Sequence, residues 1–298
     1  MFNAQKVLLG IAPIGWCNDD MPELGGQCTF EQIVSEMALA GFAGCEIGNK
    51  FPSDPAALQA ALDLRSLRVA SRWFSSFLLT EPYEAVASAF GRALDFLAAV
   101  GADRINVSEQ SHSIQGLPAP VLGNGRHIMD EAEWGHLIGG LNRLGAVAAG
   151  RGFKLCFHHH MGTVVQTGAE TRRLLRDTDP ETVFLCYDTG HFALAGDDPA
   201  GELRAMVDRV GHVHLKDVRG DVAARVVPGG WSFLEAVKNG VFTVPGDGTL
   251  DFDPIFALLS EGGYEGWLLV EAEQDPALAN PLEYAMKARA YIRLHAGL

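Results

Sequence analysis

Eight short apolar segments alternate with longer amphipathic segments along the whole chain, and this alternation is what most restricts the fold. Each short segment is largely aliphatic or β-branched, which is typical of strands buried on both faces. The segments lie at 6–13, 44–48, 68–74, 102–108, 154–159, 183–188, 212–216 and 266–271. Because each is followed by a helical pattern or a long excursion, the sequence predicts an α/β fold, a (β/α)8 TIM barrel.

Helical spacing separates the expected strands. Thr29-Phe-Glu-Gln32 has the form of a capping box, and Gly41 is a suitable stop for the helix that would follow. Further helices are predicted at 54–63, 82–99, 131–149, 168–177, 200–209, 253–262 and 281–295. Two connections, 109–130 and 217–250, hold Gly, Pro and polar residues, as expected of loops over an active site.

The length of 298 residues suits one barrel or two small domains. No linker, low-complexity tract or change of composition divides the chain, so we expect a single domain over 1–298. The rival fold is a doubly wound open sheet, which would place a glycine-rich turn after an early strand. The first strand instead leads into Pro-Ile-Gly-Trp-Cys-Asn-Asp at 13–19, which favours the barrel.

Charge and cysteine content restrict the partners and the compartment. With 23 Lys and Arg against 37 Asp and Glu, the net charge is −14, so nucleic-acid binding is not expected. No apolar run approaches the ~20 residues of a membrane span, and the first residues do not form a signal peptide. The five cysteines contain no CxxC pair, which indicates reduced thiols in a cytoplasmic enzyme. We expect a small-molecule substrate, and the sequence is compatible with a homo-oligomer.

Histidines and carboxylates follow six of the expected strands at the point where each strand ends. In a barrel, these ends meet at the face that carries the active site. The residues are Glu46, Glu109, His158, His159, His160, Asp188, His191, His212, His214, Asp217, Glu271 and Glu273, and Lys216 lies among them. One polar residue after a strand is unremarkable, but six strands in this pattern predict a shared site.

The donor types indicate a metal. Imidazoles and carboxylates without well-placed thiolates suit Mn2+, Co2+, Fe2+ or Zn2+. Because residues i and i+2 of a strand share a face, three pairs should point the same way. These pairs are His158 with His160, His212 with His214, and Glu271 with Glu273. Only some of these side chains can reach one ion.

Simpler structural roles compete with functional ones at several positions. Asp188 is also a suitable helix N-cap. Cys156 and Cys186 lie inside apolar strands and are expected to be plain core residues. Trp16 and Trp73 follow strands and would serve either packing or substrate binding.

Motifs that span nearly the whole chain resemble a known group of barrels. They lie at 10–26, 157–163, 187–191 (Tyr-Asp-Thr-Gly-His), 212–219 (His-Val-His-Leu-Lys-Asp-Val-Arg), 242–248 and 271–276. Their order resembles that of the xylose-isomerase-like superfamily of sugar isomerases, epimerases and endonuclease IV. Within it, the chain closely resembles the inosose dehydratase family of myo-inositol catabolism.

The resemblance implies one divalent ion held by Asp188, His214 and Glu271. The superfamily usually supplies a fourth ligand, a glutamate, from strand five. That glutamate is absent here, and His158 stands in its place, with His160 as the alternative.

The implied reaction is dehydration of 2-keto-myo-inositol (scyllo-inosose) to a trihydroxycyclohexane-1,2-dione, with Mn2+ or Co2+ and a dependence on glutathione. Loss of a proton beside the ketone gives an enolate whose charge an ion can stabilise, while an acid protonates the departing hydroxyl. We expect Glu271 to take the proton and His158 or His160 to act as the acid. The implied catalytic residues are Glu271, His158, His160 and His191, and the substrate-binding ones are Asn18, Glu46, Lys50, Trp73, Lys216 and Glu273.

Three other functions fit parts of the pattern. A keto-sugar or ketocyclitol isomerase or epimerase would use the same fold and ion, but commonly needs a second glutamate where this chain has His158. An endonuclease IV-like repair enzyme would need more metal ligands and a basic groove, which the charge of −14 disfavours. A metal-free binding module is disfavoured because Asp188, His214 and Glu271 are all present.

Overall fold

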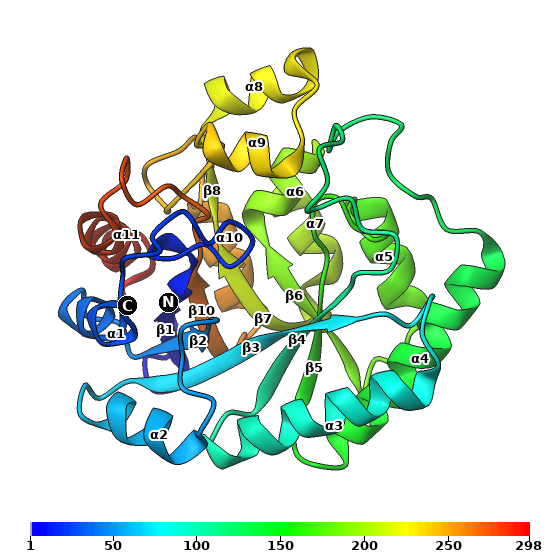
Figure 1. Cartoon of the computed structure of the whole chain (residues 1–298), viewed down its shortest axis with the longest axis horizontal. Helices are drawn as coiled ribbons and strands as arrows, with labels where there is room; N and C mark the ends of the chain where they lie inside the picture. The colour runs from blue at the N-terminus through cyan, green and yellow to red at the C-terminus, as the bar shows by residue number, and fades with distance from the viewer. Residues whose placement is uncertain (1) are drawn as a thin grey trace.

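Eight parallel strands close into a barrel in a computed structural model that describes residues 2–298 (Figure 1). Around the barrel the strands follow the order β1-β10-β7-β6-β5-β4-β3-β2. Their bounds are β1 (Val7–Ile11), β2 (Gly44–Ile47), β3 (Arg68–Ser76), β4 (Arg104–Glu109), β5 (Lys154–His158), β6 (Val183–Asp188), β7 (Val210–Leu215) and β10 (Gly266–Val270). The predicted (β/α)8 barrel is confirmed, and each expected strand is found at its expected place.

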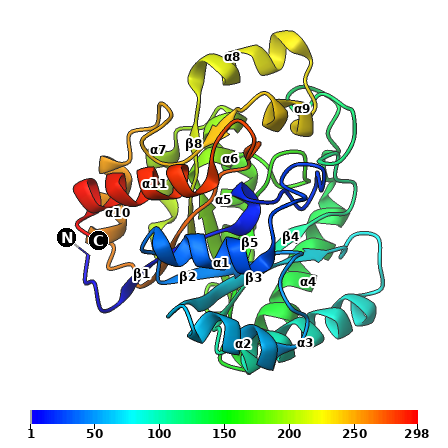
Figure 2. The ribbon, with the colours of Figure 1, turned by 60° about the vertical axis from the view of Figure 1, so that its left-hand side comes forward.

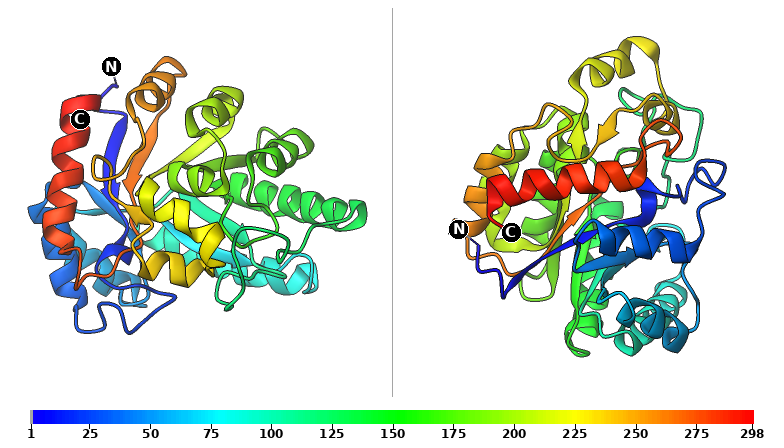
Figure 3. Two further views of the ribbon diagram at one scale, coloured as in Figure 1. Left: turned by 90° about the horizontal axis from the view of Figure 1, so that it is seen from above. Right: turned by 90° about the vertical axis from the view of Figure 1, so that its left-hand side faces the viewer.

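Helices surround the barrel and cover the outer faces of the strands (Figures 2 and 3). Thr29 and Asp54 each cap a helix by accepting backbone N–H bonds, and Asp130 forms a full capping box with Glu133. The helices are α1 (Phe30–Leu39), α2 (Pro55–Asp63), α3 (Tyr83–Ala99), α4 (Glu131–Ala149), α5 (Gly168–Asp177), α7 (Pro199–Met206), α10 (Asp253–Glu261) and α11 (Pro281–Ala296), with single 3-10 turns at Pro13–Gly15 and Val207–Arg209. Their buried stripes pack against the strands and form one continuous core.

The connection 217–250, expected as a loop, has a structure of its own. It holds a short antiparallel pair, β8 (Asp217–Val218) with β9 (Phe242–Thr243), and the helices α8 (Gly220–Gly229) and α9 (Phe233–Lys238), drawn in yellow in Figure 1. Their apolar side chains bury a second, smaller core at the carboxyl end of the barrel. The prediction of a loop over 217–250 is wrong, because glycines and Pro228 interrupt two short amphipathic patterns that form helices. A short helix, α6 (Thr189–Ala195), also follows β6 directly.

A glycine allows close packing at the opposite end of the barrel, where β2 begins. A Cβ on Gly44 would lie 2.5 Å from the Trp267 ring, so the missing side chain at position 44 makes room for the indole.

Trp16 follows β1, at the carboxyl end of the barrel. It is buried, and its Nε1 donates to Glu36 Oε2 over 2.6 Å, so it serves packing.

All five cysteines are buried and free. Burial raises the pKa of Cys156 and of Cys186 to about 12, so both thiols are inert core groups, as predicted. None of the helices in the described part of the chain is both long and apolar enough to span a membrane.

Candidate active site

Three side chains from neighbouring strand ends meet around one nitrogen of a fourth, His214 Nδ1. His158 Nε2 and Glu271 Oε2 each lie 3.1 Å from this atom, and Asp188 Oδ2 lies 3.5 Å from it. The strands β5, β6, β7 and β10 supply the four residues in turn, because these strands are adjacent in the barrel. We call His158, Asp188, His214 and Glu271 the ligand cluster.

The ligand cluster fits a divalent ion. With metal–donor bonds of about 2.1 Å, neighbouring donor atoms lie about 3.0–3.4 Å apart, close to the 3.1–3.5 Å that separate His214 Nδ1 from the other three donors. Asp188 Oδ2 is buried without a hydrogen-bond partner, as expected of an oxygen that awaits a cation. Burial opposes the charge of Glu271, but Lys216 and His214 outweigh it and lower the carboxyl pKa to about 2, so Glu271 is ionised.

His158 and His160 occupy different places in the site, although both lie at the end of the same strand, β5. Because β5 ends at His158, this imidazole points into the ligand cluster. His160 lies beyond the strand, where its Nδ1 is 2.9 Å from the carbonyl oxygen of Met161 and its Nε2 is 3.9 Å from Glu273 Oε1. The structure therefore brings His158 to the cluster and leaves His160 beside Glu273.

Lys216 is fully buried beside the cluster. Its Nζ lies 2.7 Å from Glu271 Oε1, 3.3 Å from Glu273 Oε2 and 3.0 Å from His191 Nε2. Burial disfavours the ammonium, but the surrounding carboxylates more than offset this and raise the Lys216 pKa. The position of Lys216 also explains why residue 190 is glycine, because a Cβ there would lie 2.5 Å from Lys216 Cγ.

Asp188 has two roles at once. Its Oδ1 accepts the backbone N–H of His191 over 2.8 Å and so caps α6, which leaves Oδ2 for the cluster. The His191 ring is fully buried behind His160, with ring centroids 3.9 Å apart. Burial, with the nearby His160 and Lys216, holds the His191 pKa well below its usual value, so this ring is neutral.

Glu46 lies on the other side of His214. Its Oε1 is 3.1 Å from His214 Nε2 and 3.4 Å from His212 Nε2. Burial opposes its charge, but the two imidazoles hold the Glu46 pKa well below its ordinary value. His212 itself stays neutral, because burial lowers its pKa to about 4.

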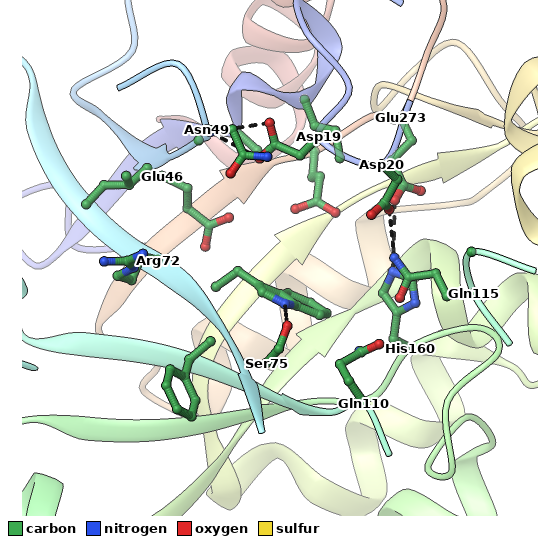
Figure 4. Close-up of a pocket in the computed structure, with 18 of the residues that line it drawn as sticks. Asp19, Asp20, Glu46, Asn49, Arg72, Ser75, Gln110, Gln115, His160 and Glu273 are labelled. Carbon is green, nitrogen blue, oxygen red and sulfur yellow. Dashed lines mark hydrogen bonds and ion pairs between the residues drawn. The ribbon is translucent and has the colours of Figure 1, made fainter. Parts of the chain in front are cut away.

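A cavity of about 740 Å³ opens above these residues (Figure 4). Five residues predicted for the site line it, namely Glu46, Trp73, His160, Glu271 and Glu273. Trp73 packs edge-on against both His158 and His160, with centroids 5.3 and 5.5 Å apart. Glu271 is thus the one member of the ligand cluster that also lines the cavity.

Asn18 and Lys50 are not among the residues that line the cavity. Lys50 Nζ donates to the carbonyl oxygens of Gly26 and Cys28, each over 2.6 Å. Asn18 Oδ1 accepts the backbone N–H groups of Asp20 and Met21, each over 2.9 Å. In this structure both side chains shape the loop after β1.

Several residues of the cavity were not predicted from the sequence. We call Asp19, Asp20, Arg72 and Gln115 the cavity wall. Asp20 Oδ2 accepts from Gln115 Nε2 over 2.7 Å, which joins the loop after β1 to the loop after β4 across the opening (Figure 4). An arginine inside strand β3 and two consecutive aspartates after β1 were the available signals.

Comparison with known proteins agrees with this geometry. The model of the xylose isomerase-like TIM barrel family matches residues 34–295. Over the full length of both chains, the protein is 57% identical to an inosose dehydratase of Geobacillus thermodenitrificans. An inosose dehydratase of Clostridium beijerinckii is 55% identical over 297 residues and equally covered.

The chain belongs to the inosose dehydratase family. Solved structures share its fold at low sequence identity. A structure of the IOLI protein with a bound zinc atom has a TM-score of 0.72 and 14% identity, and covers 97% of this chain and 98% of its own. The structure of a D-psicose 3-epimerase in the presence of D-fructose has a TM-score of 0.71 and 18% identity. The match covers 98% of this chain and 100% of the epimerase chain. The family thus confirms the resemblance and makes the protein a hydro-lyase.

Proposed function

We propose that this site removes water from 2-keto-myo-inositol to give trihydroxycyclohexane-1,2-dione. Full-length relatives named inosose dehydratase support the activity. The observation that carries the chemistry is the shared position of Glu271, which contacts His214 in the ligand cluster and also lines the cavity. A substrate ketone in the cavity would therefore lie beside the ion.

The ligand cluster would hold the ion, and we propose Mn2+ or Co2+. When bound, the ion supplies a positive charge that polarises the ketone and stabilises the enolate charge. Both oxygens of Glu271 are occupied, since Oε1 contacts Lys216 and Oε2 contacts His214. We therefore move the removal of the α-proton from Glu271, where the sequence placed it, to Glu273.

Glu273 and His160 form a pair that faces the cavity. Glu273 Oε1 lies 3.9 Å from His160 Nε2, while Oε2 is held by Lys216 at 3.3 Å. His160 Nδ1 lies on a carbonyl oxygen, that of Met161, so this nitrogen carries a proton and the reactive nitrogen is Nε2. In our proposal Glu273 takes the α-proton, and the imidazolium of His160 donates from Nε2 to the departing hydroxyl.

The other histidines have supporting roles in this proposal. His158 belongs to the ligand cluster, and His191 is screened from the cavity by His160 and bonded to Lys216. Lys216 in turn pairs with the carboxylates of Glu271 and Glu273 and keeps Glu271 ionised. The family resemblance implies a dependence on glutathione, so the assay is run both with and without it.

The test uses protein stripped of metal with a chelator. Added Mn2+ or Co2+ should restore formation of the dione from 2-keto-myo-inositol, followed by its absorbance, with and without glutathione. Epimerisation of a keto-hexose, followed by NMR, should stay at background. Metal-dependent epimerisation without dione formation, or rapid nicking of an abasic DNA duplex, would contradict the proposal.

A further inference from the structure

We propose that Glu46 is a positioning residue that fixes the metal-binding face of His214. The sequence had assigned Glu46 to substrate hydroxyls. This inference rests on the proposed function only in that the ligand cluster holds an ion.

One oxygen of Glu46 receives most of the polar contacts around it. Oε1 accepts from Asn106 Nδ2 over 2.6 Å and from the hydroxyl of Ser71, and it lies 3.1 Å from His214 Nε2. The residue is only 7% exposed. With these donors Oε1 is already satisfied, so this oxygen has little capacity left for a sugar hydroxyl.

This contact sets the tautomer of His214. A carboxylate oxygen only accepts, so the Nε2 of His214 must carry a proton to bond Glu46 Oε1. The lone pair of a neutral His214 ring then lies on Nδ1, the atom around which His158, Asp188 and Glu271 gather. An imidazole that binds a metal with one nitrogen commonly donates the other N–H to a carboxylate, which fixes the ring and increases its basicity.

The same support is missing from the second imidazole of the cluster. His158 Nδ1 is buried without a hydrogen-bond partner. The two histidines therefore differ, and His214 is the ligand whose orientation the protein specifies. Strand β2 supplies this support from across the barrel, since it is not a neighbour of β7.

Glu46→Gln tests the idea with little change of shape. We expect a loss of about 10- to 100-fold in affinity for Mn2+, measured by competition with a chelator, because second-sphere carboxylates have effects of this size. With Co2+, the visible absorption spectrum should change as the coordination changes. At saturating metal, the KM for 2-keto-myo-inositol should stay within about threefold, since Glu46 does not bind substrate in this account.

Asp19→Asn is the matched control, because Asp19 is another cavity carboxylate without a contact to the ligand cluster. It should leave the affinity for Mn2+ unchanged. Wild-type affinity in Glu46→Gln, together with a KM raised tenfold or more, would overturn the proposal and return Glu46 to the substrate.

A measurement on the unaltered protein covers the case in which Glu46→Gln does not fold. In 15N-histidine-labelled protein loaded with Zn2+, a diamagnetic probe, His214 should bind through Nδ1 and retain a slowly exchanging Nε2–H. Coordination through Nε2 would overturn the proposal. Because these readouts follow the ion and not the dione, a protein that binds Mn2+ but forms no dione would refute the proposed function alone.

Discussion

The ligand cluster and the cavity wall lie on two sides of one cavity but are built differently. The ligand cluster comes from strand ends, is almost fully buried, and has side chains fixed by hydrogen bonds and by the barrel. The cavity wall comes mainly from loops after β1 and β4 and is partly exposed. Chemistry that needs fixed donors is thus placed on the rigid barrel, while contacts that shape the opening are placed on loops.

The ligand cluster and the cavity wall also differ in how they accommodate charge. A buried ion costs several kcal/mol unless it is paired, so the cluster must be nearly balanced as a whole. Lys216 and the carboxylates around it provide that balance without solvent. Changes in the cluster should therefore have large effects, and changes in the cavity wall small ones.

The largest effect is expected from Asp188→Ala, which removes an oxygen of the ligand cluster. Bound Mn2+ should fall to near zero, and dione formation should drop by about 10³-fold or more, because the stabilisation of the enolate charge is lost. Metal analysis and the dione assay check this.

Asp188 also caps α6, so a control must separate the two roles. Asp198→Ala removes an equivalent cap from α7 and should cost about 1 kcal/mol of stability while leaving the metal in place. Full metal occupancy in Asp188→Ala would remove Asp188 from the cluster.

Gly190→Ala tests how tightly the cluster is packed. The added methyl group would press on Lys216, so we expect a loss of about 1–3 kcal/mol in the free energy of unfolding. Gly139→Ala in α4, where nothing lies within 4 Å of the added atom, should instead stabilise the protein by about 0.5–1 kcal/mol. Denaturant titration compares the two, and equal stability of both variants would show that the cluster can relax.

Asp19→Asn tests a charge in the cavity wall. Burial raises the Asp19 pKa to about 6, above its unfolded value of about 3.9, so the folded state favours the protonated carboxyl. The wild-type protein should therefore lose stability as pH rises from about 4 to 6, whereas Asp19→Asn lacks this pH dependence. Because Asp19 is partly open to solvent, the loss should be small. Unfolding titrations between pH 4 and 7 should show that the difference in free energy of unfolding between Asp19→Asn and the wild type grows as pH rises. A difference that does not change with pH would contradict this expectation.

The smallest effect is expected from Gln115→Ala, which cuts the bond to Asp20 across the opening. Loss of one partly exposed hydrogen bond of about 1 kcal/mol should raise KM about fivefold with kcat nearly unchanged. Gln59→Ala removes a similar bond to Asp63 on α2 and should change neither constant. A lower kcat in Gln115→Ala would assign the cavity wall a part in the chemistry.

The sequence was sufficient where local periodicity decides position. Strand ends are recognisable from short apolar runs, and a barrel brings them to one face, so the histidines and carboxylates that follow the strands could be placed together. The choice of Asp188, His214 and Glu271 among them came from the family resemblance. The helices α8 and α9 could not be predicted from the sequence, because Gly and Pro interrupt their short apolar stripes.

Contacts between distant parts of the chain also escaped the sequence. Glu46 and His214 are 168 residues apart, and no local pattern reports which nitrogen a carboxylate will meet. Lys50 carries the charge expected of a substrate ligand, yet backbone carbonyl groups of a neighbouring loop satisfy it instead. Tertiary contacts decide both cases.

The central claim is that the ligand cluster supports proton loss while His160, facing the cavity, completes the elimination. The most direct measurement incubates 2-keto-myo-inositol in D2O with His160→Gln and His158→Gln proteins, and compares enzyme-dependent deuterium incorporation with dione formation. The account predicts that His160→Gln keeps metal and exchange but loses dione formation, whereas His158→Gln loses metal and both reactions. Equal loss of exchange and elimination in metal-loaded His160→Gln would contradict it.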